Sequence, residues 1–392
     1  MKDSILVFGG GILQLSIIKR TKILGFKAIV IDPDANAPGK EIADVFETVA
    51  GDDFKSTKRI ATENNIKGVI TAATDKPILM MSRIAEEMDL PFPSYSSCET
   101  FLDKAKFKQF LKFYNLPHAK GEMYEGPIEV RFLNINFPTI TKPVTNSGSR
   151  GVLKSNNKIE LQNAIHETLE HSKDGRFLIE DYLEGDEISV EALFQHGKVH
   201  ILQITDKIVT PPPYNVELGH IQPSKFNVLS NDIEILLQKV VDESGLNNCA
   251  LHPELKINDG KITIIEIGPR LGGDFITSDL VPLSTDVNME EQVIRIATGQ
   301  EISYSIRNNA SIITFFNFPI QKIVKNQLIV EKQKSKYPGL KSMHFNLKIG
   351  DITPQITNSL NRYGYYILHG HSIPELLNMK TEIDLSVQNE IY

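Results

Sequence analysis

Short apolar runs alternate with helical segments over the first 95 residues, and this alternation most strongly limits the fold. Runs such as ILVFG at Ile5, AIVID at Ala28 and GVITAA at Gly68 are separated by long stretches with a helical pattern. Strands so far apart in sequence cannot pair through tight hairpins, so they favour parallel βαβ units. Residues 1–95 are therefore predicted to form an open parallel α/β domain.

The composition is that of an ordinary globular protein and argues against several functional classes. The chain has 392 residues, enough for two to four domains of about 100–200 residues each. A formal net charge of -7 offers no broad cationic surface for nucleic acid or an acidic membrane. Cys98 and Cys249 lack a CxxC partner, which argues against a disulfide framework or a thiolate zinc site. No secretory pattern opens the chain and no apolar segment approaches the roughly 20 residues that span a bilayer, so we expect a cytoplasmic protein.

Pro91 and Pro93 interrupt the first pattern, and the mixture of strands and helices that follows is typical of α+β structure. We expect one helix over residues 97–115, within a central domain over residues 96–300. A tail over residues 301–392, with its own strands and a helix near its end, is expected to form a small α+β module.

The stretch LHPELKINDGKITIIEIGPRLGGD is the most informative, because each of its two predicted strands carries a glutamate. A two-residue turn at Asp259-Gly260 would place Glu254 and Glu266 on opposite faces of the hairpin. A three-residue loop that also contains Asn258, with the glycine in the left-handed conformation, pairs residue 252 with 266 and puts both glutamates on one face. We favour the three-residue loop.

Two carboxylates on one face, followed by Arg270, suit a hard cation that also binds phosphate oxygens. Mg²⁺ prefers oxygen ligands, keeps several waters, and takes one or two protein carboxylates together with substrate phosphates. The alternative is that Glu254 and Glu266 are solvated on an exposed face of the sheet.

Two lysines upstream favour the phosphate interpretation. Lys104 lies at the start of a helix, and Lys142 lies in a predicted strand immediately before the small-residue loop TNSGSRG. Such a strand and loop supply an ammonium group and backbone N–H groups, the combination that holds the β- and γ-phosphates of a nucleotide. The loop, which contains Ser147, Gly148 and Ser149, is also the expected lid. The P-loop pattern GxxxxGK[ST] is absent.

The stretch LIEDYLEGDEISVE provides a third element. The backbone of Glu180, Asp181, Tyr182 and Leu183 offers donors and acceptors at a spacing suited to the edge of an adenine ring. Glu187 follows where a carboxylate could accept hydrogen bonds from ribose hydroxyls. The alternative is an acidic strand end followed by a turn.

The order of these motifs resembles that of the ATP-grasp superfamily. The resemblance covers nearly the whole chain and rests on an N-terminal α/β domain followed by Asp103-Lys104, TKPVTNSGSRGV, EDYLEGDEISVE, HPEL and EIGPRLGGD. It implies a central ATP-grasp fold and an enzyme that joins a carboxylic acid to an amine through an acyl phosphate. The implied cofactors are ATP and Mg²⁺, with Mn²⁺ as the alternative ion.

The resemblance also implies roles for the matching positions, taken here ligand by ligand. Phosphates are assigned to Lys104 and Lys142, the adenine to Glu180 and Leu183, the ribose to Glu187, the metal to Glu254 and Glu266, and the acyl phosphate to the catalytic Arg270. The further expected ATP-binding residues are Ser147, Gly148, Ser149, Asp181 and Tyr182. Many relatives carry an asparagine ligand where Gly268 stands, so we expect water or substrate to take one coordination position.

Within the superfamily, YNVELGHIQPS and EIGPRLGGD resemble the L-amino-acid ligase branch, which forms dipeptides or related amides. This implies that Glu217 and His220 face the substrates, with Glu217 binding the ammonium group of the acceptor. Gly272, Gly273 and Asp274 are expected beside them. Asp274 stands where some relatives carry a bulky aromatic residue, so the site gains room and negative charge. The expected partners are small acids and amines and a second copy of the chain, without nucleic acid or membrane.

Two other interpretations stay open. The motif FGGGILQ, with Asp32 closing the next strand, partly matches the dinucleotide-binding fingerprint, but Gln14 stands where its third small residue belongs. We interpret it as a tight strand-to-helix turn rather than as part of an NAD-dependent Rossmann dehydrogenase or a non-catalytic nucleotide-binding module. The other alternative is a purine-biosynthesis carboxylase or formyl-transfer enzyme of the same superfamily. Its phosphate-bearing substrate would require several further cationic groups, and the sequence shows no clear set.

Overall fold

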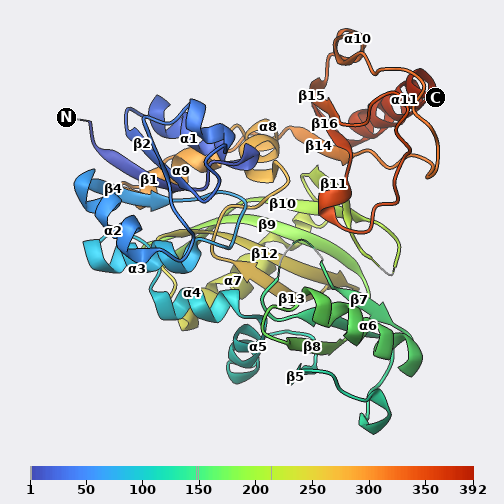
Figure 1. Cartoon of the computed structure of the whole chain (residues 1–392), viewed down its shortest axis with the longest axis horizontal. Coiled ribbons are helices and arrows are strands. Elements are labelled where there is room, and N and C mark those ends of the chain that lie inside the picture. Colours follow the sequence, from blue (N-terminus) through green and yellow to red (C-terminus); the bar gives the residue numbers. More distant parts are fainter. Residues whose placement is uncertain (1, 147, 149, 213) are drawn as a thin grey trace.

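The computed structural model describes residues 2–146, 148, 150–212 and 214–392, and it begins with a four-stranded sheet (Figure 1). The strand order is β3-β2-β1-β4, and every neighbouring pair is parallel. The elements are β1 (Ser4–Phe8), α1 (Leu15–Ile23), β2 (Lys27–Asp32), β3 (Val45–Thr48), α2 (Phe54–Glu63), β4 (Ile66–Ile70) and α3 (Ile78–Met88). All of β1 is buried because helices pack against both faces of the sheet. The predicted open parallel α/β domain is confirmed.

Two helices follow where the sequence predicted one. They are α4 (Tyr95–Leu102) and α5 (Lys104–Phe113), and the backbone at Asp103 is extended, with φ of -99° and ψ of 107°. The prediction of a single helix over residues 97–115 is therefore wrong. The Asp103 side chain caps the second helix, and an aspartate at an N-cap position competes well with continued helix.

A small antiparallel sheet comes next, with the order β5-β8-β6-β7. Its strands and the helix that packs on it are β5 (Gly121–Glu125), β6 (Thr139–Pro143), β7 (Leu153–Ser155), α6 (Lys158–His171) and β8 (Arg176–Asp181). Leu161 and Ile165 of α6 pack with Phe177 and Ile179 of β8 in a core that belongs to this sheet alone.

The largest sheet has eight strands in the order β13-β12-β9-β10-β11-β14-β16-β15, and all neighbouring pairs are antiparallel. The strands are β9 (Asp186–Gln195), β10 (Lys198–Val209), β11 (Glu217–Gln222), β12 (Cys249–Asn258), β13 (Lys261–Gly268), β14 (Ala310–Phe315), β15 (Leu340–Phe345) and β16 (Gly364–Gly370). Strands from both sides of residue 300 therefore belong to one sheet. The predicted domain boundaries stay predictions.

The remaining helices cover this sheet and its ends (Figure 1). They are α7 (Ser230–Ser244), α8 (Val281–Thr285), α9 (Met289–Ala297), α10 (Val330–Lys336) and α11 (Ile373–Ile391). Short helical turns are formed by Ile12–Gln14, Pro38–Glu41, Val130–Phe132, Asn227–Leu229, Ile276–Leu280 and Ser359–Asn361. No helix within the described part of the chain is both long and apolar enough to span a membrane.

One hydrophobic core joins all three predicted regions. Val30 of the first domain, Leu280 of the central region and Ile367 of the C-terminal region belong to the same buried cluster. Because no region has this core to itself, the loops at the ends of the parallel strands are held against the large sheet.

Candidate active site

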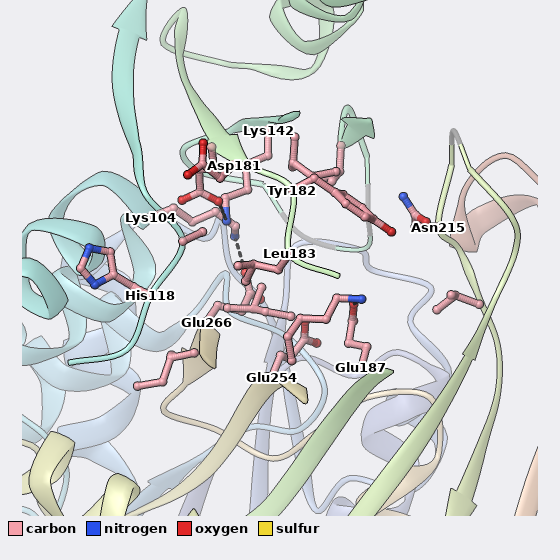
Figure 2. Close-up of a pocket in the computed structure, with 18 of the residues that line it drawn as sticks. Lys104, His118, Lys142, Asp181, Tyr182, Leu183, Glu187, Asn215, Glu254 and Glu266 are labelled. Carbon is pink, nitrogen blue, oxygen red and sulfur yellow. Dashed lines mark ion pairs between the residues drawn. The ribbon is translucent and has the colours of Figure 1, made fainter. Parts of the chain in front are cut away.

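A cavity of about 440 Å³ lies between the small and the large antiparallel sheet, within the usual size range of small-molecule sites (Figure 2). Most residues predicted to bind nucleotide, metal or substrate line it, namely Lys104, Lys142, Gly148, Glu180, Asp181, Tyr182, Leu183, Glu187, Glu217, Glu254 and Glu266. The others do not line it, and these are His220, Arg270, Gly272, Gly273 and Asp274. Ser147 and Ser149 lie outside the described residues.

Lys104 reaches the cavity because the helix break at Asp103 makes it the first residue of α5. Its Nζ lies 2.9 Å from Glu266 Oε2 and donates a hydrogen bond to the carbonyl oxygen of Asn146 at 2.9 Å. Burial disfavours the charged ammonium, but the Glu266 carboxylate more than compensates and raises the pKa of Lys104. This side chain is thus a fixed cation between the helix and β13.

Glu180 binds two lysines at once. One carboxylate oxygen lies 2.6 Å from Lys142 Nζ on the neighbouring strand β6, and the other lies 2.6 Å from Lys108 Nζ on α5. Burial disfavours the charged carboxylate, but the two ammonium groups lower the pKa of Glu180. Two cations sharing one carboxylate leave positive charge for an anion. Lys108 was missed by the sequence analysis, although it follows Lys104 by four residues and so shares its helix face.

The backbone after Glu180 has fewer hydrogen-bond donors available for adenine than predicted. The N–H groups of Asp181 and Tyr182 already donate to the carbonyl oxygens of Lys120 and Pro138, at 2.8 and 3.0 Å. The Leu183 N–H has no hydrogen-bond partner among the residues that the structure describes. It is therefore the donor of this stretch that remains available to a ligand in the cavity.

The turn between β12 and β13 differs from the prediction. Asn258 pairs with Lys261, so the connection is the two-residue turn Asp259-Gly260, with φ of 48° and 77°. The predicted three-residue loop, and with it the pairing of residues 252 and 266, is wrong. Positive φ at both central residues gives the turn a twist that matches the twist of the strands, which favours the shorter connection.

A β-bulge nevertheless brings the two glutamates together. Between Glu254 and Leu255 the register shifts by one residue, so that Leu255 pairs with Ile264 whereas Glu254 pairs with Glu266. The extra residue on β13 is Ile265. Both carboxylates therefore face the same cavity, as predicted, although the bulge rather than the turn is the cause.

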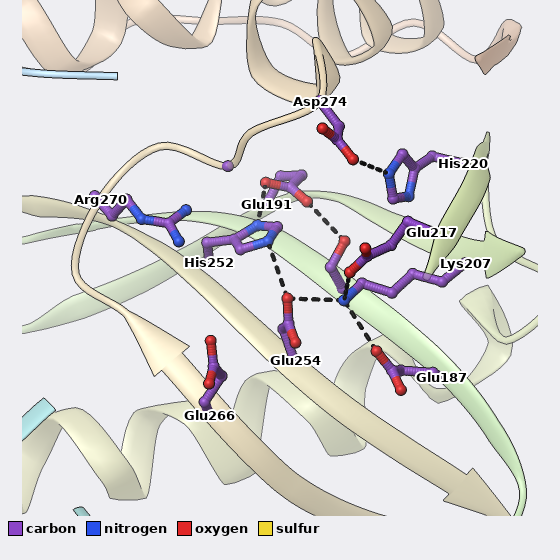
Figure 3. Close-up of polar contacts among 12 residues, drawn as sticks. Glu187, Glu191, Lys207, Glu217, His220, His252, Glu254, Glu266, Arg270 and Asp274 are labelled. Carbon is purple, nitrogen blue, oxygen red and sulfur yellow. Dashed lines mark hydrogen bonds and ion pairs between the residues drawn. The ribbon is translucent and has the colours of Figure 1, made fainter. Parts of the chain in front are cut away.

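Lys207 of β10 is the cation of a buried cluster that the sequence analysis missed (Figure 3). Its Nζ lies 2.7 Å from Glu254, 3.0 Å from Glu187 and 3.8 Å from Glu217. Burial disfavours its charge, but these carboxylates raise the pKa of Lys207 well above its ordinary value. For Glu217, burial prevails over the attraction of Lys207, and its pKa is raised. The available signal was a lysine inside the otherwise alternating strand sequence ILQITDKIV.

Arg270 is held by the N-terminal domain. Its Nε and Nη2 donate to the two carboxylate oxygens of Asp75, at 2.5 and 3.3 Å. Its side chain also lies over Gly268, where an added Cβ would approach Arg270 Cζ to 3.4 Å. Asp75 was missed by the sequence analysis, although it follows β4 at the edge where α/β sheets bind ligands.

Asp274 has the predicted negative charge, but the C-terminal region neutralises it. Arg362 donates two hydrogen bonds to the Asp274 carboxylate, at 2.7 and 2.6 Å. His220 Nε2 lies 3.4 Å from the same carboxylate. Burial disfavours the charged form, but Arg362 and His220 hold the pKa of Asp274 well below its ordinary range. Arg362 had no recognisable signal in the sequence.

His252 connects Glu254 to a buried carboxylate. Its Nδ1 lies 3.0 Å from Glu191 Oε2, and its Nε2 lies 3.7 Å from Glu254 Oε1. Gly272 packs directly on this pair, because an added Cβ would lie 2.7 Å from His252 Nδ1 and 2.9 Å from Glu191 Oε2. The glycine thus has a packing role beside the site.

The glutamate pair fits a metal that phosphates also coordinate. The described residues contain no group of three or more His, Cys, Asp or Glu side chains that could hold a metal ion. Glu254 and Glu266 each face an ammonium group, of Lys207 and Lys104, so a cation is already stabilised at both. Mg²⁺ needs only one or two protein carboxylates when substrate phosphates complete its coordination.

The N-terminal glycine turn is filled by its own side chains. The Gly10 N–H donates to Asp32 Oδ2 at 2.7 Å, and Gln14 Nε2 donates to the Ala72 carbonyl oxygen at 2.6 Å. A Cβ on Gly11 would lie 2.9 Å from Gln14 Oε1. The glycine N–H and the Asp32 carboxylate, two groups of the dinucleotide-binding fingerprint, thus bond to each other, which agrees with a structural turn.

In a comparison with known protein families, residues 135–279 match the model of the ATP-grasp domain. The carbamoyl phosphate synthase large chain of Thermoanaerobacter sp. (strain X514) is 24% identical over 218 residues, which cover 53% of this chain and 20% of that protein. The chain therefore spans about a fifth of the length of this curated relative.

Solved structures of similar fold cover the whole chain. An L-amino acid ligase from Bacillus licheniformis has a TM-score of 0.80 at 19% identity, covering 100% of this chain and 98% of that one. A phosphoribosylglycinamide synthetase from Anaerococcus prevotii has a TM-score of 0.74 at 20% identity, covering 100% and 99%. These likenesses show the fold, and the predicted central ATP-grasp fold is confirmed.

Proposed function

We propose, because residues 135–279 match the model of the ATP-grasp domain, that this chain is an ATP-dependent, ADP-forming ligase that joins the carboxyl group of one small molecule to the amine of another. We propose amino acids, or closely related small acids and amines, as its substrates. The observation that carries the proposal is the pairing of Glu254 with Glu266 in one cavity with Lys104 and Lys142.

The nucleotide would lie between the two antiparallel sheets. Lys104 and Lys142 are placed for its phosphates, and Lys108 supports Lys142 by sharing Glu180. The available N–H of Leu183 would bond the adenine edge. Glu187, which forms an ion pair with Lys207 in this structure, would accept a hydrogen bond from a ribose hydroxyl.

Glu254 and Glu266 would hold Mg²⁺, with Mn²⁺ as the alternative ion. When bound, the ion would neutralise phosphate oxygens during phosphoryl transfer. Lys104 would neutralise the same phosphate oxygens, because its ammonium group lies beside Glu266. The two carboxylates and the lysine would thus bind the metal and the triphosphate as one unit.

The reaction would proceed in two steps. An oxygen of the donor carboxylate attacks the γ-phosphorus of ATP, and the bond from this phosphorus to the β,γ-bridging oxygen breaks. ADP departs, and the donor becomes an acyl phosphate. Arg270, oriented by Asp75, would stabilise its negative charge. The amine nitrogen then attacks the acyl carbon and phosphate leaves. Glu217, whose pKa is raised by burial, would bind the amine and accept its proton.

The proposal is tested by measuring ADP and phosphate release over a matrix of amino acids as donors and acceptors. We expect release that requires both an acid and an amine, and we expect Glu266→Ala or Arg270→Ala to lower it by at least about 100-fold. Lys380→Met is the control, because Lys380 forms a partly exposed pair with Asp384 within α11 and does not line the cavity.

The same experiment includes a fluorescence titration with NAD and a phosphorylated ribosylamine as acceptor. NAD binding without ADP release would indicate the dehydrogenase or binding-module alternative, and use of the phosphorylated amine alone would indicate the purine-pathway alternative. Full activity of folded Glu266→Ala or Arg270→Ala protein would refute the assignment of the site.

A further inference from the structure

The ion pair between Asp274 and Arg362 connects two distant parts of the chain beside the cleft. The residues are 88 positions apart, and both nitrogens at the end of the arginine bond to the aspartate. The exposed fraction is 23% for the Asp274 side chain and 11% for the Arg362 side chain. The pair is therefore largely buried, but solvent still reaches it.

Arg362 is held in place by more than its charge. Its Nε donates to the Ser359 carbonyl oxygen at 3.0 Å, and its guanidinium carbon lies 3.6 Å from the centre of the Phe315 ring. Its Nη1 also donates to the carbonyl oxygen of Glu217 at 3.3 Å. The cation is thus immobilised on the C-terminal strands and directly supports the strand that carries Glu217.

The aspartate, in turn, adopts an unfavourable backbone conformation. Asp274 and Phe275 have φ of 49° and 61°, the left-handed region that residues with a side chain rarely occupy in succession. Such strain occurs mainly where a function requires it. Here the Asp274 carboxylate points at His220 (Figure 3) and also bonds to Arg362.

Asp274 also acts on the acidic residue that lines the cavity. Burial is the main cause of the raised pKa of Glu217, Lys207 opposes it, and the negative charge of Asp274 adds to it. The geometry links the two residues through Arg362, which bonds to the backbone carbonyl oxygen of Glu217 and to the carboxylate of Asp274. Without that arginine, the partly exposed Asp274 carboxylate would be a second acidic group near Glu217 without a cationic partner of its own.

We propose that the Asp274–Arg362 pair selects the charge of the amine substrate. By neutralising Asp274, Arg362 leaves Glu217 to bind a single ammonium group, so that the cleft accepts an amino acid with an uncharged side chain. This inference rests on the proposed function, in which Glu217 binds the acceptor.

The test is calorimetric binding of L-norleucine and L-lysine, in the presence of ADP and Mg²⁺, to the wild type and three variants. These two amino acids have side chains of similar length and differ in one terminal ammonium group. The wild type should prefer norleucine. Arg362→Met should shift the ratio of dissociation constants toward lysine by about tenfold, because Asp274 then lacks its partner. Asp274→Asn should shift it away from lysine, and the double variant should restore the ratio of the wild type.

Lys380→Met again serves as the control, because it removes a cation of the same region that lies away from the pair. If Arg362→Met does not fold, Asp274→Asn decides, since the unpaired Arg362 should then favour L-glutamate over L-glutamine. A ratio that changes less than about threefold in the folded variants, or absence of binding of both amino acids to every protein, would overturn the inference. Binding with the expected shifts but without ADP release would refute only the proposed ligase activity.

Discussion

Lys207 contacts three carboxylates for which the sequence predicts three different ligands. Glu187 is assigned to the ribose, Glu217 to the amine and Glu254 to the metal, yet all three lie within 3.8 Å of one ammonium group. Removing charges from water is costly unless opposite charges compensate them, and Lys207 supplies that compensation. We infer that this residue keeps the acidic groups together before a nucleotide binds.

We predict that Lys207→Met lowers the free energy of unfolding by about 3–5 kcal/mol, because it leaves the buried carboxylates without their cation. The measurement is urea denaturation with and without Mg²⁺ and ADP, and added Mg²⁺ should restore part of the loss. Lys380→Met, which breaks a partly exposed pair, should change the free energy of unfolding by less than about 1 kcal/mol. A Lys207→Met protein as stable as the wild type would contradict the assigned role.

At the scale of elements, the loop after β13 carries most of the side chains that complete the cleft. Arg270 bonds to the N-terminal domain and Asp274 bonds to the C-terminal region, whereas Gly272 between them lies against the His252–Glu191 pair. A short loop can reach both partners only if its middle stays close to the sheet. The absence of a side chain at Gly272 allows this approach.

We predict that Gly272→Ala destabilises the protein by about 1–3 kcal/mol, because its Cβ would lie 2.7 Å from His252 Nδ1. Gly273→Ala is the matched control, since a Cβ there would meet only the Ala73 Cβ, at 3.8 Å. Thermal unfolding of both variants distinguishes them. Equal melting temperatures would show that the loop relaxes away from the sheet without cost.

The hairpin before this loop shows what local sequence can and cannot predict. The residues Asp259 and Gly260 correctly indicated a turn, and the alternation around them correctly indicated strands. Turn length and the bulge at Ile265 were not predictable, because a bulge leaves the pattern of residue types nearly unchanged. The two glutamates were expected on one face for the wrong reason.

At the scale of the whole molecule, a buried hydrogen bond joins the N-terminal domain to α9 beside the core that the three regions share. Glu290 of α9 accepts a hydrogen bond from Ser16 Oγ of α1 at 2.7 Å, whereas its other carboxylate oxygen has no partner among the described residues. Burial raises the pKa of Glu290 from 4.5 to about 7. We therefore expect the contact between the N-terminal domain and α9 to weaken as the pH rises.

The folded protein keeps the Glu290 proton up to about pH 7, whereas the unfolded chain loses it near pH 4.5, so stability should fall as the pH rises between these values. Above pH 7 the loss amounts to about 3 kcal/mol. We predict that Glu290→Gln, which can still accept from Ser16, is more stable than the wild type at pH 8 and equally stable at pH 4. Urea denaturation at both pH values tests this, with the exposed Glu331→Gln as control. If wild type and Glu290→Gln differed in free energy of unfolding by the same amount at pH 4 and at pH 8, the effect would be excluded.

The sequence by itself determined the parallel N-terminal domain, the order of the lysine and glutamate motifs, and most of the charged side chains that line the cavity, although not Lys108. These features depend on residue periodicity and on the chemistry of single side chains, which are local properties. Tertiary structure decided which charges meet. Asp75 and Arg270 are 195 positions apart, and Asp274 and Arg362 are 88 apart. An ion pair forms only where folding brings the groups within a few ångströms, and no local pattern encodes that distance.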